Sequence, residues 1–490
     1  MARCCEENFI CNPRCNENDF ICKPIKTNKC SKCGNLLENP SFEAGLTGWV
    51  TNNVSASVEK PFEGTATARM GQTAPSMFQD VLLNKNCRKP LLLSFEILPS
   101  LIERDVVVGN LIIEVIWLNA KGDVIGTGLR TLIPANRTSE NRNILTFVEI
   151  TDMPPDNAVK ARLQFSKGAR ASNTTNILDI DNVILAPINT INLVKNSGFE
   201  LGLTNWTFTN AFPHFRDSYE GTATARLLSD GTLLQNIPIN SFMPNSSFLL
   251  SFAVIGGSNP GSLRAQVIWL NQLGAPIGTG LDLFINGEML NDQSNFTTYV
   301  DVTKAAPDNA VTAQIKFTST PGQNFLNIDK VIFARVRSRN LLENPSFENG
   351  LSPWTGEGVN VIQSNESYEG NKLLTINADG GFVFQDVSVQ SARCYLLNFG
   401  YEVLANGSEG NLIAQVDWLD KDGRQINRGL SIIILEKSVP FVGRWVTYLG
   451  VTEPAPENAV KARIQFSKSR GIGDTLAGID IDKVVFARLV

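Results

Sequence analysis

The chain has 490 residues and a formal net charge of −5, with acidic and basic residues interspersed along its length. This balance gives no basic surface that would favour nucleic acid or an anionic membrane as a partner. Since there is no run of eighteen apolar residues, and the N-terminus lacks the apolar stretch of a secretory leader, we expect neither a membrane-spanning helix nor a signal peptide.

The first 34 residues differ in composition from the rest of the chain. They hold seven of the nine cysteines and few bulky apolar residues, so we expect a flexible, Cys-rich arm rather than a folded core. Three interpretations remain open. Cys30 and Cys33 have the spacing of half a zinc site, and the cysteines could instead close into an internal disulfide knot.

The third interpretation, which we favour, is an arm that links neighbouring copies covalently. Because seven is an odd number, at least one thiol is left over after internal pairing. Two cysteines of the later chain are further partners for such links. The intermolecular disulfide candidates are Cys4, Cys5, Cys11, Cys15, Cys22, Cys30, Cys33, Cys87 and Cys394.

One motif occurs three times after the arm. Residues 35–49, 192–206 and 340–354 share a pattern that ends in Phe-Glu-x-Gly-Leu-x-x-Trp. This spacing matches a whole domain rather than a solenoid repeat. The sequence therefore predicts an arm of residues 1–34 and three domains, at residues 35–188, 189–336 and 337–490. The linkers at residues 186–191 and 334–339 are very short, which favours a semi-rigid row of domains.

The strand pattern is clearest in the middle of each copy. Residues 111–118, 263–270 and 412–419 alternate between apolar and polar, which predicts strands with one buried face. We expect the Trp of each strand in the core rather than on a ligand-binding surface. Many short strands with Gly, Asn and Pro turns predict an all-β protein: three tandem antiparallel jelly-roll β-sandwich domains after the arm.

The repeated landmarks resemble a known family. An Asn-x-x-Phe-Glu-x-Gly-x-x-x-Trp opening, a Glu-Gly loop some twenty residues later and a closing Ile-Asp-x-Val are similar to the galactose-binding-like jelly roll of carbohydrate-binding modules. This resemblance covers residues 35–490. A closer likeness is to the related domain that precedes collagen-like repeats in spore-surface proteins, although this chain has no Gly-X-Y tract. The arm resembles the cysteine-bearing connectors of endospore appendage and exosporium proteins, through adjacent Cys4 and Cys5 and through Cys11 and Cys22.

The resemblance implies a structural calcium ion in each domain. In such modules the opening Glu and the closing Asp hold calcium, which takes six to eight oxygen ligands. Carbonyl groups of the Glu-Gly loops at Glu63, Glu220 and Glu369 would complete the set. The alternative is that these carboxylates only cap loops. The matching pairs are Glu43 with Asp181, Glu200 with Asp329, and Glu348 with Asp482.

The polar faces of the central strands are candidates for a sugar-binding groove. Long polar side chains can reach hydroxyl groups, although the exposed face of any soluble sandwich also carries such residues. No exposed aromatic pair is evident in all three copies. The groove candidates are Glu114, Gln164, Gln266, Gln314, Gln415 and Gln465.

The motifs of common enzymes are missing from the sequence. The single histidine, His214, occurs in one copy only, and no Gly-x-Ser-x-Gly, Walker or dinucleotide pattern is present; we therefore expect no enzyme. We interpret the chain as a self-assembling structural protein of a spore surface, exosporium or appendage. Its arm would bind copies of itself or other spore-surface proteins. The alternative is a carbohydrate-binding adhesin with three tandem glycan-binding modules.

Overall fold

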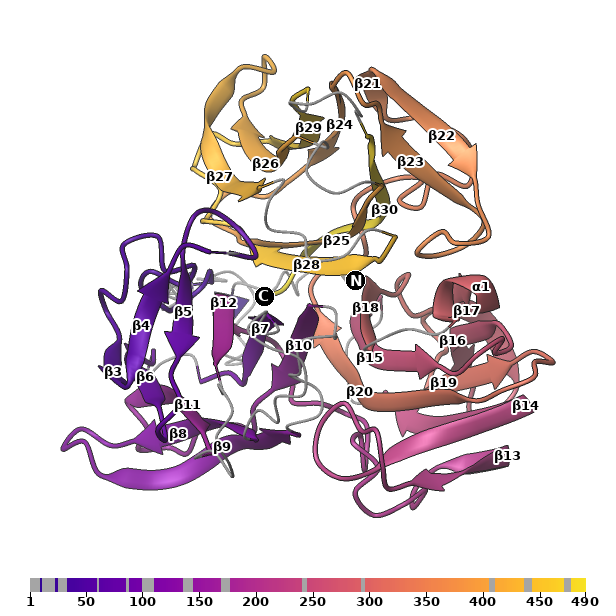
Figure 1. Cartoon of the computed structure of the whole chain (residues 1–490), viewed down its shortest axis with the longest axis horizontal. Helices are drawn as coiled ribbons and strands as arrows, with labels where there is room; N and C mark the ends of the chain where they lie inside the picture. The colour runs from indigo at the N-terminus through magenta and orange to yellow at the C-terminus, as the bar shows by residue number, and fades with distance from the viewer. Residues whose placement is uncertain are drawn as a thin grey trace, which may run out of the picture.

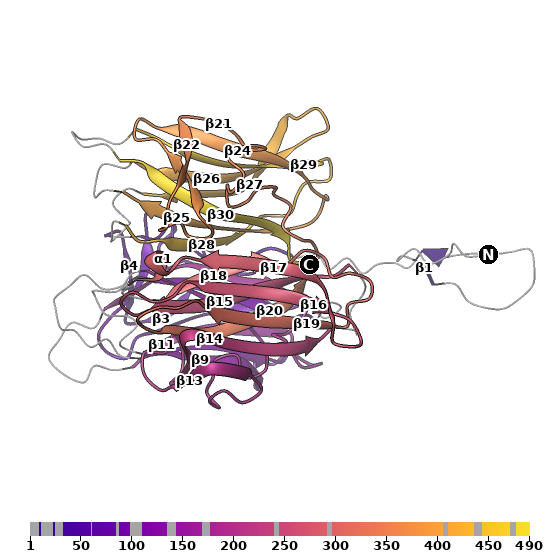
Figure 2. The same cartoon turned by 90° about the vertical axis from the view of Figure 1, so that its right-hand side faces the viewer.

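The computed structural model describes residues 33–59, 61–84, 88–98, 110–134, 144–168, 177–239, 245–291, 296–404, 410–435, 443–470 and 477–490. It also describes the backbone of two short antiparallel strands in the arm, β1 (Phe9–Ile10) and β2 (Lys23–Pro24). Figure 2 shows β1 well outside the body formed by the three domains.

Domain 1 is a sandwich of two antiparallel sheets, as the alternating patterns predict. Their strand orders are β10-β7-β12-β5-β4 and β3-β6-β11-β8-β9. The strands are β3 (Val50–Asn52), β4 (Val54–Ser57), β5 (Thr67–Met70), β6 (Ser76–Leu82), β7 (Leu91–Leu98), β8 (Leu111–Leu118), β9 (Val124–Ile133), β10 (Leu145–Ile150), β11 (Lys160–Lys167) and β12 (Leu178–Pro187).

Domains 2 and 3 repeat this topology. In domain 2 the long strand β14 runs through both layers and joins them into one sheet, and domain 3 has two separate five-stranded sheets. The all-β prediction is confirmed. The elements are β13 (Thr207–His214), β14 (Thr224–Pro238), β15 (Ser247–Gly256), β16 (Leu263–Leu270), β17 (Pro276–Ile285), α1 (Gly287–Leu290), β18 (Thr297–Val302), β19 (Thr312–Ser319), β20 (Leu326–Val336), β21 (Thr355–Glu357), β22 (Val359–Gln363), β23 (Lys372–Ile376), β24 (Gly381–Ser388), β25 (Tyr395–Val403), β26 (Leu412–Leu419), β27 (Gln425–Ile434), β28 (Val446–Val451), β29 (Lys461–Lys468) and β30 (Ile479–Arg488).

A buried Trp anchors the core of each sandwich, as predicted. Trp117 is 1% exposed, and Gly128 on the neighbouring strand β9 lies against its indole ring. A Cβ atom at Gly128 would come within 2.3 Å of that ring, so the close approach requires glycine. The same pairing occurs for Trp269 with Gly280 and for Trp418 with Gly429.

The three sandwiches close into a ring around a common axis (Figure 1). The layers that contain β7, β15 and β25 face the centre, and the layers that contain β8, β16 and β26 lie at the periphery. Strands β10, β18 and β28 contact one another pairwise at the centre. The expected row of domains is therefore wrong, because every domain packs against both of the others.

A hydrophobic cluster fills the centre of the ring. Each domain contributes six buried aliphatic residues to it, beside Cys33 and Cys394, so no domain buries its centre-facing sheet without the other two. The geometry is that of a closed cyclic trimer built within one chain. The members are Leu92, Val148, Ile150, Ile184, Ala186 and Ile188 of domain 1; Leu249, Val300, Val302, Ile332, Ala334 and Val336 of domain 2; and Leu396, Leu449, Val451, Val485, Ala487 and Leu489 of domain 3.

Helix is scarce in the described part of the chain. Its one helix, α1, has four residues, and none of the described helical structure is long and apolar enough to cross a membrane.

Candidate functional site

The outward faces of the peripheral sheets carry all six groove candidates. Strand register places Phe78, Gln164 and Glu114 side by side across β6, β11 and β8. All three are partly exposed, because the alternate residues of these strands fill the core. The corresponding rows are Leu234, Lys316 and Gln266 in domain 2, with Gln314 two residues before Lys316 on β19, and Phe384, Gln465 and Gln415 in domain 3.

Beside this row lies an aromatic, cationic and acidic set that the sequence analysis missed. The Arg162 guanidinium lies 4.1 Å from the centre of the Phe78 ring. Arg162 also donates through Nε and Nη2 to the two carboxylate oxygens of Asp80, at 2.6 and 3.0 Å. The arginine is therefore fixed over the ring by a two-point ion pair.

Domain 3 repeats this set at equivalent positions. Arg463 lies 4.0 Å from the centre of the Phe384 ring and donates to Asp386 at 2.7 and 2.9 Å. Domain 2 has lost all three members together, since Leu234, Gln314 and Asn236 occupy the places. Two of these changes are visible in the sequence as Leu-Gln-Asn in place of Phe-Gln-Asp, and the third is Gln314 in place of Arg162 in a later segment. This parallel change was a signal that could have found the set.

Domain 3 adds a second ring. Phe382 lies two residues before Phe384 on the same face, with the ring centres 6.4 Å apart and the planes tilted by 14°. Nearby, Asp417 accepts hydrogen bonds from Arg428 and Gln425, both at 2.9 Å. With the Gln415 amide turned so that its oxygen faces the donors, this oxygen accepts a hydrogen bond from Arg428 Nη1 at 2.7 Å. Ring faces beside such donors and acceptors can stack on the apolar face of a sugar and bind its hydroxyl groups.

The residues predicted to hold calcium bind the Glu-Gly loops in a different way. In domain 1, Glu43 accepts hydrogen bonds from the backbone N–H groups of Thr65 and Ala66, at 2.8 and 3.0 Å. Asp181 accepts from the N–H of Phe62 at 2.8 Å. Glu200 with Asp329, and Glu348 with Asp482, bind their own loops in the same manner.

This arrangement does not fit a calcium ion. Calcium needs converging oxygen atoms, whereas the loops present N–H donors to these carboxylates. Within the described ranges, no group of three or more Asp, Glu, His or Cys side chains could hold a metal. The loop-capping alternative describes the observed contacts, and calcium binding has only the resemblance in its favour.

The Glu-Gly loops also form the seams between domains. The Tyr219 ring of domain 2 stacks on Phe147 of domain 1 with centres 5.2 Å apart, and its hydroxyl donates to the Thr146 carbonyl at 2.6 Å. Gly221 N–H donates to the Leu132 carbonyl at 2.7 Å. Tyr368 and Gly370 of domain 3 make the equivalent seam with domain 2, and Phe62 and Gly64 of domain 1 make it with domain 3. Each loop thus docks on the next domain, which closes the ring.

Two of the three seams contain a buried lysine between two carboxylates. Lys330 is bonded to Glu149 of domain 1 and, at 2.8 Å, to Glu220 of its own domain. Burial alone would lower the pKa of Lys330, but the two carboxylates outweigh this effect and hold it raised. Lys483 lies in the same way between Asp301, at 2.8 Å, and Glu369, at 3.5 Å.

The third seam, between domains 3 and 1, has no such lysine among the described residues. Asn182 stands in its place and donates to the Leu449 carbonyl at 2.9 Å, while Gly450 replaces the partner acid. The third seam also buries Glu96, and neither of its carboxylate oxygens has a hydrogen-bond partner among the described residues. Burial raises the pKa of Glu96 well above its usual range, and the carboxylates of Asp181 and Glu63 add to this effect.

We expect this seam to make stability fall as pH rises. Above the unfolded pKa of about 4.5 the unfolded chain releases the Glu96 proton that the folded chain retains. The associated stability is fully present below that pH and is lost as the pH rises through the folded pKa. Glu96→Gln should flatten this slope, by up to about 1.4 kcal/mol per pH unit, in urea denaturation between pH 5 and 8. Stability curves that run parallel for Glu96→Gln and for the exposed control Glu343→Gln would contradict this expectation.

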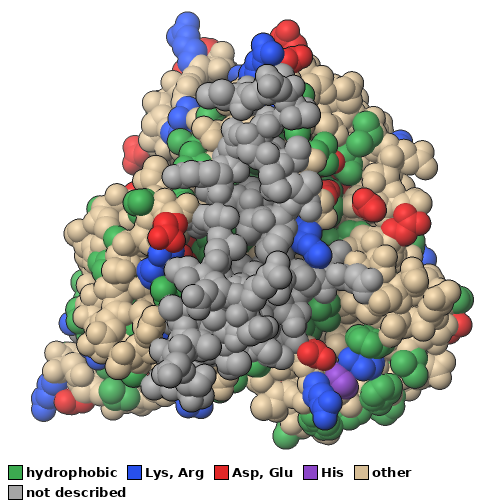
Figure 3. Space-filling view, in the orientation of Figure 1, with side chains coloured by type: hydrophobic (Ala, Val, Ile, Leu, Met, Phe, Trp, Pro, Cys, Tyr) green, Lys and Arg blue, Asp and Glu red, His purple; other side chains and the backbone are tan. Residues whose placement is uncertain are grey.

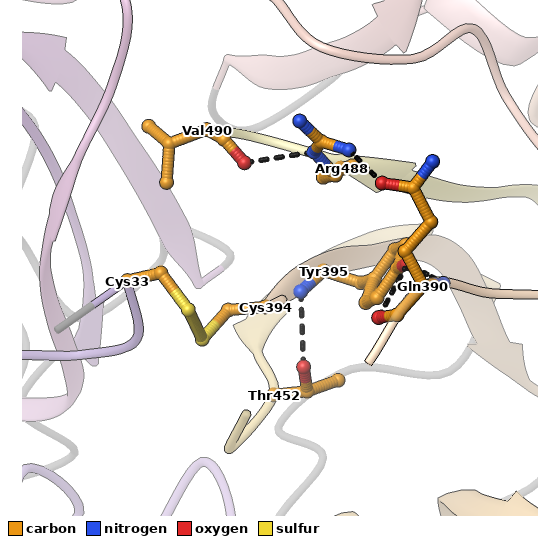
Figure 4. The surroundings of a disulfide bond; sticks show 7 residues. All are labelled: Cys33, Gln390, Cys394, Tyr395, Thr452, Arg488 and Val490. Carbon is orange, nitrogen blue, oxygen red and sulfur yellow. Dashed lines mark hydrogen bonds between the residues drawn. A yellow bond between two sulfur atoms is a disulfide. The ribbon is translucent and has the colours of Figure 1, made fainter. Parts of the chain in front are cut away.

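A disulfide bond also spans the third seam. Cys33, just before domain 1, is bonded to Cys394, the residue before β25 in domain 3, with Cα atoms 5.6 Å apart (Figure 4). The prediction that these two cysteines link different molecules is therefore wrong, because ring closure brings them together. Because its sulfur is in the disulfide bond, Cys33 does not offer the free thiolate that the zinc interpretation requires. The other candidates, Cys4, Cys5, Cys11, Cys15, Cys22, Cys30 and Cys87, lie outside the described residues.

The surface viewed along the axis has mixed charge. Figure 3 shows acidic and basic side chains scattered over all three domains, and the one histidine lies at the edge of domain 2 among basic and apolar side chains. His214 is 3.9 Å from Asp217. The expectation that the chain is not an enzyme remains a prediction.

Comparisons with known proteins give fold-level likenesses. No protein-family model and no curated protein matches the chain. Among the similar solved structures is the tandem CBM22 domain of Paenibacillus barcinonensis Xyn10C, with 14% identity over 61% of this chain and 97% of that one, and a TM-score of 0.25. TmCBM61 in complex with β-1,4-galactotriose has 20% identity over 31% and 99%, and a TM-score of 0.24. A family 16 carbohydrate-binding module has 19% identity over 30% and 99%, and the same TM-score of 0.24.

Proposed function

We propose that the chain is a glycan-binding protein whose binding surfaces are the outward sheet faces of domains 1 and 3. The observation that carries this proposal is the repeated Phe, Arg and Asp set beside the row of polar side chains. A single partly exposed Phe needs no explanation. Two that recur at equivalent strand positions, each with an ion-paired arginine over the ring, indicate a selected surface.

The ring gives these surfaces a fixed relation to each other. Both lie on peripheral sheets whose opposite faces are packed into the sandwich cores, so the side chains project from rigid strands. A preorganised polar and aromatic surface loses less conformational entropy when a ligand binds. Domain 2, which lacks the set, serves in this proposal as part of the scaffold.

Phe384→Ala should weaken glycan binding roughly tenfold, because an aromatic contact of this kind contributes about 1.4 kcal/mol. The measurement is binding to an array of glycans, followed by titration of the best ligand. Leu234→Ala at the equivalent place in domain 2 is the matched control and should leave binding unchanged. Equal losses in the two variants, or an array without a bound glycan, would contradict the proposal.

Self-assembly at a spore surface stays a prediction from the sequence. Of its nine candidate cysteines, the two that the structure describes are bonded to each other. The intermolecular links would depend on Cys4, Cys5, Cys11, Cys15, Cys22, Cys30 and Cys87. Assembly and glycan binding are compatible, since they would use different parts of the chain.

A further inference from the structure

The three copies place different groups at one position of the centre-facing sheet. In domain 1, Arg69 of β5 donates through Nε and Nη2 to both oxygens of Asp179 on β12, each at 2.8 Å. In domain 2, Arg226 donates to Asn327 at 2.8 Å and lies 3.4 Å from the centre of the Phe325 ring. A guanidinium therefore occupies this position in two of the three copies.

Domain 3 has lost this guanidinium and gained a carboxylate. Thr375 takes the place of the arginine and donates its hydroxyl to Asp480 at 2.6 Å. On the other side of Asp480, strand register places Glu402 where domains 1 and 2 have Leu98 and Ile255. Two acidic side chains thus lie side by side, and the arginine of the other copies is replaced here by Thr375.

A cavity of about 220 Å³ adjoins this position, in the seam between domains 2 and 3. Figure 1 shows α1 of domain 2 beside domain 3 at this seam. Among the residues that the structure describes, three carboxylates and one guanidinium line the cavity, so this part of its wall is acidic on balance. The lining residues are Glu288, Met289, Asn291, Glu366, Glu402, Gly443, Arg444 and Trp445.

The Glu402 side chain is the unusual group in this cavity. It is 6% exposed, and in the part of the chain that the structure describes no hydrogen bond or ion pair reaches its carboxylate. Burial raises the pKa of Glu402 to about 8, with Asp480 and Glu366 adding to the effect. A buried carboxylate without a partner is costly, so an entering cation that binds it would be strongly favoured.

We propose that this cavity binds an organic cation with a guanidinium or ammonium head group, which takes in domain 3 the role that Arg69 has in domain 1. Glu402 would accept its hydrogen bonds, and the Trp445 indole, fixed by a 2.7 Å bond from Nε1 to the Glu366 carbonyl, borders the same space. A bare metal ion fits less well, because no three acidic groups among the described residues converge on one point.

The first test is calorimetric titration of the full chain with agmatine, which carries both head groups. We expect saturable binding with one site per chain, weakened at least tenfold in Glu402→Gln and unchanged in the exposed control Glu343→Gln. The tripeptide Gly-Arg-Gly is titrated in parallel. Tighter binding of agmatine would indicate a free amine as the ligand, and tighter binding of the tripeptide would indicate an arginine of a partner protein. Equal binding of agmatine to Glu402→Gln and to the native chain would overturn the proposal. So would a binding heat that disappears when sodium chloride is added to the same ionic strength as the agmatine solution.

A second variant keeps the proposal testable if Glu402→Gln fails to fold. Thr375→Arg places an arginine where the other two domains have one, and the introduced guanidinium should occupy the cation site. We expect this variant to melt at a higher temperature than the native chain and to lose agmatine binding. A Thr375→Arg chain that binds agmatine as the native chain does would show that the cation site lies elsewhere.

Discussion

Lys330→Asn should destabilise the protein by about 3–5 kcal/mol. The substitution leaves Glu149 and Glu220 buried in the seam between domains 1 and 2 without their shared cation, and losing one partner of a buried ion pair has an effect of this size. Urea denaturation at pH 7.5 measures the change. Lys195→Asn, at an exposed lysine of the same domain, is the control and should change stability little.

The chain itself supplies the rescue experiment. The third seam has Asn182 and Gly450 at the two positions where this seam has Lys330 and Glu149. The double variant Lys330→Asn with Glu149→Gly should therefore recover part of the lost stability, because it removes one of the two unpaired carboxylates. A double variant that is less stable than Lys330→Asn alone would show that the lysine acts through packing rather than through charge.

Cys394→Ala should lower the free energy of unfolding by about 2–4 kcal/mol. The bond to Cys33 joins residues separated by 361 positions, so it restricts a very long loop in the unfolded chain. It also holds the seam that has Asn182 at the position of the buried lysine of the other two. Urea denaturation with and without dithiothreitol measures the effect. The reductant should lower the stability of the native chain to that of the variant and leave the variant unchanged. If the reductant does not change the stability of the native chain, and the variant is still less stable, the loss comes from packing at Cys394 instead.

The sandwich fold could be predicted because its signal is local. The alternating pattern at residues 111–118 coincides with strand β8, and Trp117 fell on the buried face as its phase required. Strand patterns of this kind depend only on which neighbours face the core. The same reasoning placed Glu114 and Gln164 correctly on the outward face.

The ring could not be predicted from such patterns. The sequence predicts for Glu220 only a place in a loop near calcium, whereas the side chains of Tyr219 and Glu220 reach Phe147 and Thr131 of the preceding domain. Nothing in a local window shows that a side chain will pack against another copy of the same fold. The available signal was a parallel change at two positions. Where one copy has Lys330, the facing position of its neighbour is the acid Glu149; where another copy has Asn182, the facing position is Gly450.

Phe78 was missed for a different reason. The sequence predicts the Trp of each central strand in the core and shows no exposed aromatic pair in all three copies. Phe78 instead lies on the solvent side of its strand, where the Arg162 guanidinium lies over its ring. That pairing connects residues on different strands, so no local window shows it, and only the parallel change between copies points to it.

The outward direction of the peripheral sheets has a consequence for how the protein would act on polymers. Because the sheets of domains 1 and 3 face away from the common axis on different sides of the body (Figure 1), one flat layer cannot meet both surfaces together. Simultaneous attachment to a single plane would then add no avidity, since linked sites strengthen binding only where the geometry permits both to engage. If both surfaces bind glycan as proposed, two separate strands can occupy them, and the chain would then cross-bridge neighbouring polymers.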